Sequence, residues 1–295
     1  MTDPVPVRRR PRPILRAIGA VVSFYLLGFL LSALLLWPFA GRLTGGATAT
    51  ELAASPTPLF ALVQGASLLL AFGAATWLVG VRALHLDARE LRWRTRLGWG
   101  KALAVGLAFG ILPAAVAMMM GVFAAGAGWT DDGGSFTQWL SQVTKTVLIL
   151  GPAALAEELM FRGLPLVVAA AVLGRGRAIV VFSVVFALAH ILNPDVTGAA
   201  IGNIALAGIF LSLAFYSSGG MWTAFGAHLG WNATLAALAA PVSGLPFDIP
   251  AIDYRTGSPV WLTGGAFGPE GGLLATLTLT ATVVLVAQWV RRDAT

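Results

Sequence analysis

The chain of 295 residues is 57% hydrophobic and only 11% charged, whereas about a quarter of the residues in an ordinary soluble domain are charged. This composition excludes an ordinary water-soluble domain and indicates a membrane protein. The net charge of +6 does not indicate a nucleic-acid partner, because the basic residues stand in short runs beside apolar segments. The absence of cysteine excludes disulfides, thiolate metal ligands and a cysteine nucleophile.

Eight apolar segments approach or exceed the roughly 20 residues that a helix needs to cross a bilayer. We therefore expect an all-α, polytopic fold of about eight transmembrane helices around a polar cavity, in a single membrane domain over residues 1–295. The first segment follows a basic, Pro-rich N-terminus and is too long for a cleaved signal peptide, so we interpret it as a retained anchor. The expected spans are residues 17–40, 58–81, 102–127, 142–161, 178–193, 199–218, 221–240 and 272–290.

Two further segments are expected to lie outside the spans. Leu164 to Leu173 is apolar but too short to cross, which favours a half-inserted or interfacial helix. Pro241 to Gly271 is rich in Pro and Gly and is predicted to form an irregular outer cap.

Basic residues fall on alternate loops of this arrangement. One side holds 16 of the 19 Lys and Arg residues, and only Arg42, Lys145 and Arg255 fall on the other. By the positive-inside rule, both termini of this multi-pass cell-membrane protein should be cytoplasmic.

Ionisable residues inside apolar spans are few, and they are concentrated in one part of the chain. Of the 13 acidic residues only Glu157 and Glu158 lie in a span, and of the three histidines His190 and His228 do. Because a charged side chain near the bilayer centre costs on the order of 3 kcal/mol, such residues mark a functional site by default.

The fourth span ends in Glu157-Glu158-Leu-Met-Phe-Arg162. Glu158 and Arg162 are four residues apart and would pair on one helix face, while Glu157 points about 100° away. One carboxylate can then be structural while its neighbour faces a cavity. Taken alone, the pair of Glu158 with Arg162 is also explained as a helix-end ion pair in which the arginine reaches the membrane interface.

The seventh span contains His228 and Asn232, which share a helix face at a spacing of four residues. Gly226 and Gly230 bracket His228 in a pattern of small residues that allows close approach of a neighbouring helix. The spacings Gly106 to Gly110 and Gly198 to Gly202 are interpreted in the same way.

A carboxylate beside a histidine can deprotonate water, and a second histidine with an amide can stabilise the oxyanion formed when that water attacks a carbonyl. These residue types therefore favour peptide-bond hydrolysis by a water nucleophile. A single histidine such as His190 is also explained as a buried residue that bonds a backbone carbonyl.

The order EExxxR, FxxxH, HxxxN, each within an apolar span, resembles the CPBP family, which comprises type II CAAX prenyl proteases and bacteriocin-processing or immunity proteins and is also called the Abi family. The resemblance covers about residues 140 to 240. Its motifs are Glu157-Glu158-xxx-Arg162, Phe186-xxx-His190 and His228-xxx-Asn232.

The resemblance implies an intramembrane endopeptidase of eight helices with a cavity open to the cytoplasm. It makes Glu157 and His190 the pair that activates water, His228 and Asn232 the oxyanion-binding pair, and Glu158 and Arg162 the supporting pair. Members of the family are usually called metalloproteases, although a metal-free glutamate mechanism is also proposed for them. A zinc ion, if one is used, would be held by Glu157, His190 and His228.

The substrate, a peptide or a membrane protein with or without a lipid, is not defined by the sequence. The family name indicates prenylated tails, but 17 Arg against 2 Lys and the richness in Ala and Gly are typical of a GC-rich bacterial genome, in which such tails are not expected.

Two other classes of function compete with the protease. One is a non-catalytic immunity or scaffold protein that uses the polar cluster for packing or peptide binding. The other is a proton-coupled carrier in which Glu157 and the histidines form a relay.

The expected span limits also contain a conflict. They put Glu157 at about 7 Å and His190 at about 18 Å from the cytoplasmic edge. His190 belongs to the site only if its span starts deeper or tilts, or if Leu164 to Leu173 is re-entrant and shifts these limits.

Overall fold

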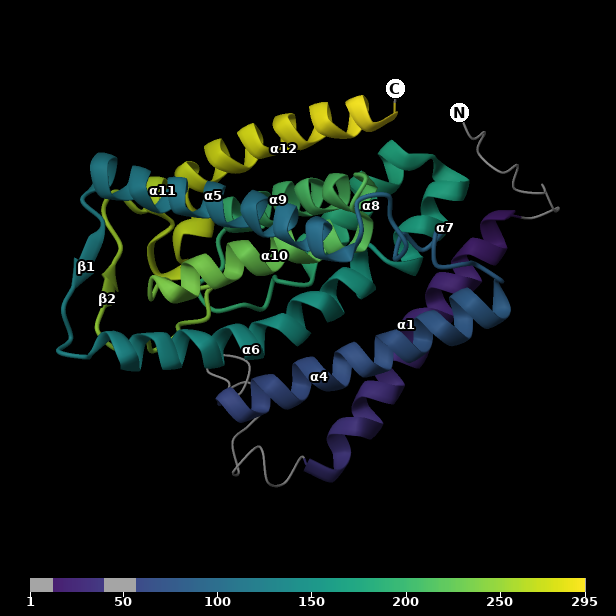
Figure 1. The fold of residues 1–295 in the computed structure, drawn as a ribbon, viewed down its shortest axis with the longest axis horizontal. Helices are drawn as coiled ribbons and strands as arrows, with labels where there is room; N and C mark the ends of the chain where they lie inside the picture. The colour runs from purple at the N-terminus through teal and green to yellow at the C-terminus, as the bar shows by residue number, and fades with distance from the viewer. Residues whose placement is uncertain (1–12, 40–56, 295) are drawn as a thin grey trace.

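The computed structural model describes residues 13–39 and 57–294 of the chain. These residues form an almost entirely helical structure with one short two-stranded ribbon (Figure 1). The longer helices are α1 (Pro13–Leu36), α4 (Pro58–Ala75), α5 (Trp99–Ala125), α6 (Phe136–Phe161), α7 (Leu164–Leu173), α8 (Arg175–Leu188), α9 (Gly198–Tyr216), α10 (Gly220–Ala237) and α12 (Leu273–Ala294). The shorter elements are the 3₁₀ turn Trp37–Phe39, the π-helical turn Thr76–Ala83 that continues α4, α11 (Val260–Thr263), and the 3₁₀ turns Gly265–Phe267 and Pro269–Gly271.

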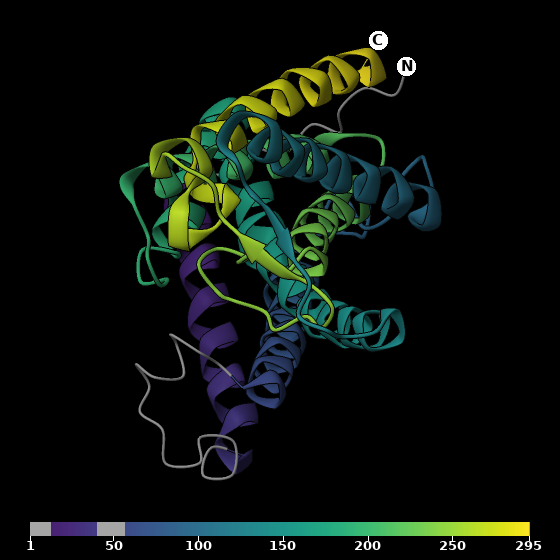
Figure 2. The ribbon, with the colours of Figure 1, turned by 90° about the vertical axis from the view of Figure 1, so that its left-hand side faces the viewer.

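Helix α6 lies at the centre of the arrangement, because it contacts α4 on one side and α10 on the other. Helix α4 in turn packs on α1, and α10 packs on α5 and α9. Helix α12 lies on the opposite side of the bundle from α1 and α4, as both views show (Figures 1 and 2).

Local sequence explains where the helices begin. Thr57 caps α4 by accepting a hydrogen bond from the backbone N–H of Phe60 at 3.2 Å, and Pro58 occupies the first helical position, where no N–H is needed. Ser135 and Gln138 form a reciprocal capping box at the start of α6. The start of the helix that contributes Glu157 is therefore set by its own first turn.

Helices α5 and α10 approach each other closely through glycines. A Cβ added to Gly106 would lie 2.3 Å from the carbonyl oxygen of Thr223, and one added to Gly110 would lie 2.1 Å from that of Ala227. A Cβ added to Gly226 or Gly230 of α10 would lie 2.5 or 2.7 Å from a backbone carbonyl oxygen of α5, so the predicted role of small residues around His228 is confirmed.

The interpretation of Gly198 and Gly202 as packing glycines was wrong. Both lie in the first turns of α9 and have open space where a side chain would be.

Five helices are long and apolar enough to cross a membrane by length and composition: Ile14–Phe39, Pro58–Ala83, Trp99–Ala125, Gly198–Tyr216 and Leu273–Arg292. These five agree with five of the eight expected spans. The expected span 142–161 corresponds to α6, which contains Lys145, Glu157 and Glu158, and the span 221–240 to α10, which has 18 residues. The finding for the described chain is therefore five candidate spans rather than eight.

The expected span 178–193 was wrong in its limits. Helix α8 begins at Arg175 and ends at Leu188, so its 14 residues are fewer than the roughly 20 that a crossing needs. The preceding helix α7 covers Leu164–Leu173, as predicted for a separate short helix. Because α7 lies beyond the end of α6 (Figure 1), α8 starts beyond α6 and brings the chain back toward it, which removes the conflict between the depths of Glu157 and His190.

The expected irregular cap contains more regular structure than its composition indicates. Strand β1 (Gly128–Thr130) pairs with β2 (Asp253–Arg255) in antiparallel register, with Trp129 opposite Tyr254. This ribbon crosses one end of the bundle (Figure 2).

Candidate active site

Glu157 and Glu158 lie on different faces of α6, as helix geometry predicts. The side chain of Glu157 is 32% exposed, and that of Glu158 is completely buried. The two adjacent carboxylates therefore have different environments, one open to a cavity and one enclosed in protein.

The buried carboxylate of Glu158 has two charged or polar partners. Its Oε1 accepts a hydrogen bond from Arg162 Nη1 at 3.0 Å and one from His228 Nδ1 at 2.8 Å. Arg162 is only 1% exposed, and its guanidinium lies 4.0 Å from the centre of the Phe186 ring. The predicted pair of Glu158 with Arg162 is confirmed, and it is an internal ion pair rather than one at the interface.

His190 lies in the turn that follows α8. Its Nδ1 is 2.7 Å from the carbonyl oxygen of Phe186, and since a carbonyl oxygen only accepts, Nδ1 carries the proton. The Phe186 ring also stacks edge-on against the His190 ring at 4.7 Å. Phe186 thus fixes the orientation of His190, which accounts for the spacing FxxxH in structural terms.

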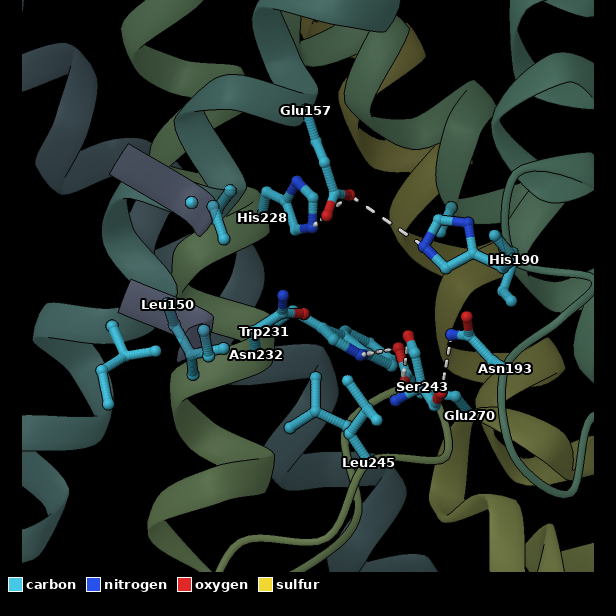
Figure 3. A pocket seen from close by; sticks show the side chains of 18 of the residues that line it. Leu150, Glu157, His190, Asn193, His228, Trp231, Asn232, Ser243, Leu245 and Glu270 are labelled. Atoms are coloured by element: carbon cyan, nitrogen blue, oxygen red, sulfur yellow. Dashed lines mark hydrogen bonds and ion pairs between the residues drawn. The ribbon is translucent and has the colours of Figure 1, made fainter. Parts of the chain in front are cut away.

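The two imidazoles face Glu157 with their other nitrogens (Figure 3). Nε2 of His190 lies 4.0 Å and Nε2 of His228 lies 3.7 Å from Glu157 Oε2. Both distances exceed that of a direct hydrogen bond, whereas a water molecule at about 2.8 Å from each atom can bridge them. With its Nδ1–H held by Phe186, the neutral His190 ring presents Nε2 as an acceptor beside the carboxylate.

Asn232 lines the same cavity as Glu157, His190 and His228. The cavity has a volume of about 640 Å³, and Asn232 projects into it one helical turn after His228 (Figure 3). Within the described chain the amide of Asn232 makes no hydrogen bond, so its donor is free for a ligand. The structure thus brings together the four residues predicted as catalytic.

A further group of cavity residues was missed by the sequence analysis. The carboxylate of Glu270, in the 3₁₀ turn before α12, accepts hydrogen bonds from Trp231 Nε1 at 3.0 Å and from the backbone N–H of Ser243. The carbonyl oxygen of Ser243 accepts a hydrogen bond from Asn193 Nδ2 at 2.8 Å. These residues come from four separate segments, and no spacing in the sequence links them.

The cavity extends toward the helix ends opposite the arginine-rich segments. Its lining includes Pro58 at the start of α4, Gln142 near the start of α6 and Asp248 after α10, and Pro58 and Asp248 are exposed. At the arginine-rich end it is closed by Phe161 and Phe186, which are 4% and 3% exposed.

A metal ion would find suitable donor types here but not a suitable arrangement. Two neutral imidazoles and a carboxylate are a donor set that zinc accepts. The described residues, however, include no group of three or more His, Asp or Glu side chains placed to hold a metal ion. The residues as placed do not fit a metal, and we derive no step through one.

These observations define an all-helical, multi-pass membrane protein with a Glu–His–His cavity. Residues 138–234 match the family described as Type II CAAX prenyl endopeptidase Rce1-like, which implies a protease. The match agrees with the family resemblance that the three motifs indicate. No curated protein and no solved structure matches the chain.

Proposed function

We propose that the chain is a CAAX-protease-like intramembrane endopeptidase that uses a water molecule activated by Glu157 and His190. One observation carries the proposal: Glu157 Oε2 faces Nε2 of both His190 and His228 inside a cavity large enough for a peptide segment. Glu157 Oε2 and His190 Nε2 are two acceptors that can hold the two protons of one water molecule between them.

In the proposed reaction, Glu157 accepts a proton from the bound water while the water oxygen attacks the carbonyl carbon of the scissile peptide bond. His190 orients this water through Nε2, since its Nδ1–H is held by Phe186. As the tetrahedral intermediate collapses, the C–N bond breaks and Glu157 returns the proton to the leaving nitrogen. The products are a carboxylic acid and an amine, which become a carboxylate and an ammonium group by transfer of one proton, and the enzyme is regenerated.

Asn232 and His228 are proposed to stabilise the oxyanion of that intermediate. The amide of Asn232 supplies an N–H donor directly. His228 supplies one from Nε2 in its protonated form, with its Nδ1–H directed at Glu158. Glu158 and Arg162 support the site by holding Nδ1 of His228.

The proposal is tested by cleavage of a quenched peptide library with the purified full-length protein in detergent. Wild type is compared with Glu157→Gln, and Glu90→Gln serves as a matched control because Glu90 is exposed in the connector before α5. We expect wild type and the control to cleave and Glu157→Gln to lose at least about a thousandfold in rate. Each assay is repeated with a chelator.

Cleavage by Glu157→Gln at the wild-type rate would contradict the proposal. A folded wild type that cleaves nothing in the library would favour the immunity or scaffold function instead. Cleavage that survives the chelator supports the glutamate mechanism, and loss of cleavage with the chelator, restored by added zinc, would show a metal mechanism.

We also propose that both termini are cytoplasmic, which the distribution of basic residues supports. The cavity mouth near Asp248 would then face the other side of the membrane. Since the chain has no cysteine, single cysteines can be labelled without background by a reagent that does not cross the membrane. We expect Asp248→Cys to be labelled from outside intact cells and Arg94→Cys only after lysis, and the reverse pattern would overturn the orientation.

A further inference from the structure

Glu270 is a second carboxylate in the wall of the same cavity, contributed by the loops rather than by the family motifs (Figure 3). Oε1 accepts the indole N–H of Trp231, and Oε2 accepts the backbone N–H of Ser243 and its hydroxyl, the latter at 3.2 Å. Its backbone is held as well, because Asn203 donates to the Glu270 carbonyl oxygen at 2.8 Å. The position of this carboxylate in the wall is therefore fixed from several elements.

The neighbours of Glu270 favour its ionised form. The indole and the amide can only donate hydrogen bonds, and an ionised carboxylate accepts about four. The three hydrogen bonds from Trp231 and Ser243 leave it further capacity to accept.

The charge of Glu270 has no cationic partner in the described part of the chain. No ion pair to it is found there, although His190 is an electrostatic neighbour. The described residues that line the cavity include three carboxylates, those of Glu157, Asp248 and Glu270, and two imidazoles, those of His190 and His228, but no Lys or Arg. An ionised carboxylate that is partly withdrawn from water and unpaired is unfavourable until a cation approaches it. The charge of this cavity is thus complementary to a cationic ligand.

We propose that Glu270 determines substrate specificity by binding the guanidinium or ammonium group of an arginine or lysine side chain in the peptide to be cleaved. This inference rests on the proposed function and names the substrate class for it. Most of the remaining lining is apolar, including Leu150, Leu245 and Phe247. The peptide segment that fits the cavity therefore carries one basic side chain among apolar ones.

The test uses peptides that differ at one position only, occupied by arginine, norleucine or glutamate, each with both ends blocked. A fourth peptide has norleucine at that position and a free amino terminus, which separates recognition of a side chain from recognition of a terminal ammonium. Cleavage and binding by fluorescence anisotropy are measured for wild type, Glu270→Gln and Asp248→Asn, all full-length in detergent. Asp248 is the matched control because it is an exposed carboxylate at the cavity rim.

We expect wild type to prefer the arginine peptide to the norleucine peptide by at least about tenfold in kcat/KM, as a charge-assisted hydrogen bond allows. Glu270→Gln should remove this preference mainly through KM and leave the norleucine peptide within about twofold. Asp248→Asn should keep the preference. Equal losses for all peptides in Glu270→Gln, no preference in wild type, or a preference only for the free amino terminus would each overturn the proposal.

Two further measurements allow the test to be interpreted if the wild type does not cleave or if Glu270→Gln does not fold. If wild type cleaves nothing but binds the arginine peptide in a way that depends on Glu270, recognition holds and the proposed hydrolysis fails. If Glu270→Gln does not fold, Ser243→Ala takes its place, because it removes one hydrogen bond to the carboxylate and retains the charge. Loss of the arginine preference in a folded Ser243→Ala protein would then contradict the proposal.

Discussion

The cavity has two unlike walls. The motif wall, formed by Glu157, His190, His228 and Asn232, places a carboxylate among groups that do not bond it directly. The loop wall, formed by Asn193, Ser243 and Glu270, places a carboxylate under three hydrogen bonds. A carboxylate without direct partners is free to exchange a proton with water, whereas one held by three hydrogen bonds keeps its position and can still accept a further donor. The comparison indicates that residues of the same type can perform chemistry on one wall and recognition on the other.

The largest effect on stability is expected behind the motif wall, at Glu158. Replacing Glu158 by Ala leaves the buried guanidinium of Arg162 without its ion-pair partner, so we expect a loss of about 3–5 kcal/mol in the free energy of unfolding. Glu157→Gln should lose less than about 1 kcal/mol, because that side chain is partly exposed and has no direct partner. Equilibrium unfolding in mixed micelles measures the free energy of unfolding of both variants. Equal losses of unfolding free energy in the two variants would contradict the assignment of a structural role to Glu158 and a chemical role to Glu157.

A smaller effect is expected where α10 is positioned against α5. Gly110→Ala places a Cβ 2.1 Å from the carbonyl oxygen of Ala227, so the helices must separate at a cost of about 1–3 kcal/mol. Gly202→Ala is the matched control, since it lies in a helix with open space around it and should stabilise by up to about 1 kcal/mol. Thermal unfolding compares the two. A Gly110→Ala protein as stable as wild type would show that close packing is not what places His228 and Asn232.

The motif wall was predictable because helical periodicity relates its residues locally. The face shared by His228 and Asn232, the pair of Glu158 with Arg162 and the separate helix Leu164–Leu173 all follow from spacing within one segment. The expected count of about eight spans is not confirmed, and the limits of one span were wrong because apolarity alone did not show that α8 has only 14 residues. His190 reaches Glu157 because α7 displaces the start of α8, which is a tertiary effect.

The loop wall was not predictable for a different reason. Glu270, Ser243, Trp231 and Asn193 meet through contacts between segments that are 27 to 50 residues apart. Loop residues have no fixed period that would indicate a shared face. In the sequence, Glu270 is distinguished only as an acidic residue in a Pro- and Gly-rich loop. Asp248 and Asp253 are acidic residues of the same loop, so this feature does not single out Glu270.

The next prediction concerns pH, because stability and peptide affinity should depend on the protonation of Glu270 in the loop wall. Burial raises the pKa of Glu270 above its ordinary 4.5, and the hydrogen bonds from Ser243 and Trp231, together with the nearby His190, lower it in part. A raised pKa of an acid means that its contribution to stability is present below the unfolded-state pKa and is lost as pH rises through the folded-state pKa. Cation binding requires the carboxylate, so affinity for the arginine peptide should rise by about tenfold over the same interval above pH 4.5. Glu270→Gln should show neither dependence, and an unchanged pH profile in that variant would exclude Glu270 as the titrating group.

The smallest effect is expected at Asn193, which joins the two walls. Its side chain donates to the Ser243 carbonyl oxygen at 2.8 Å, and its backbone N–H donates to the His190 carbonyl oxygen at 3.0 Å. Asn193→Ala should therefore cost about 1 kcal/mol in stability. Because Asn193 holds the turn of His190 against the loop rather than binding a charge, the variant should reduce kcat/KM equally for the arginine and norleucine peptides. Gln64→Ala, a change of a cavity residue on α4, controls for a change in cavity shape. A selective loss for the arginine peptide in Asn193→Ala would mean that recognition depends on how the walls are joined and not on the charge of Glu270 alone.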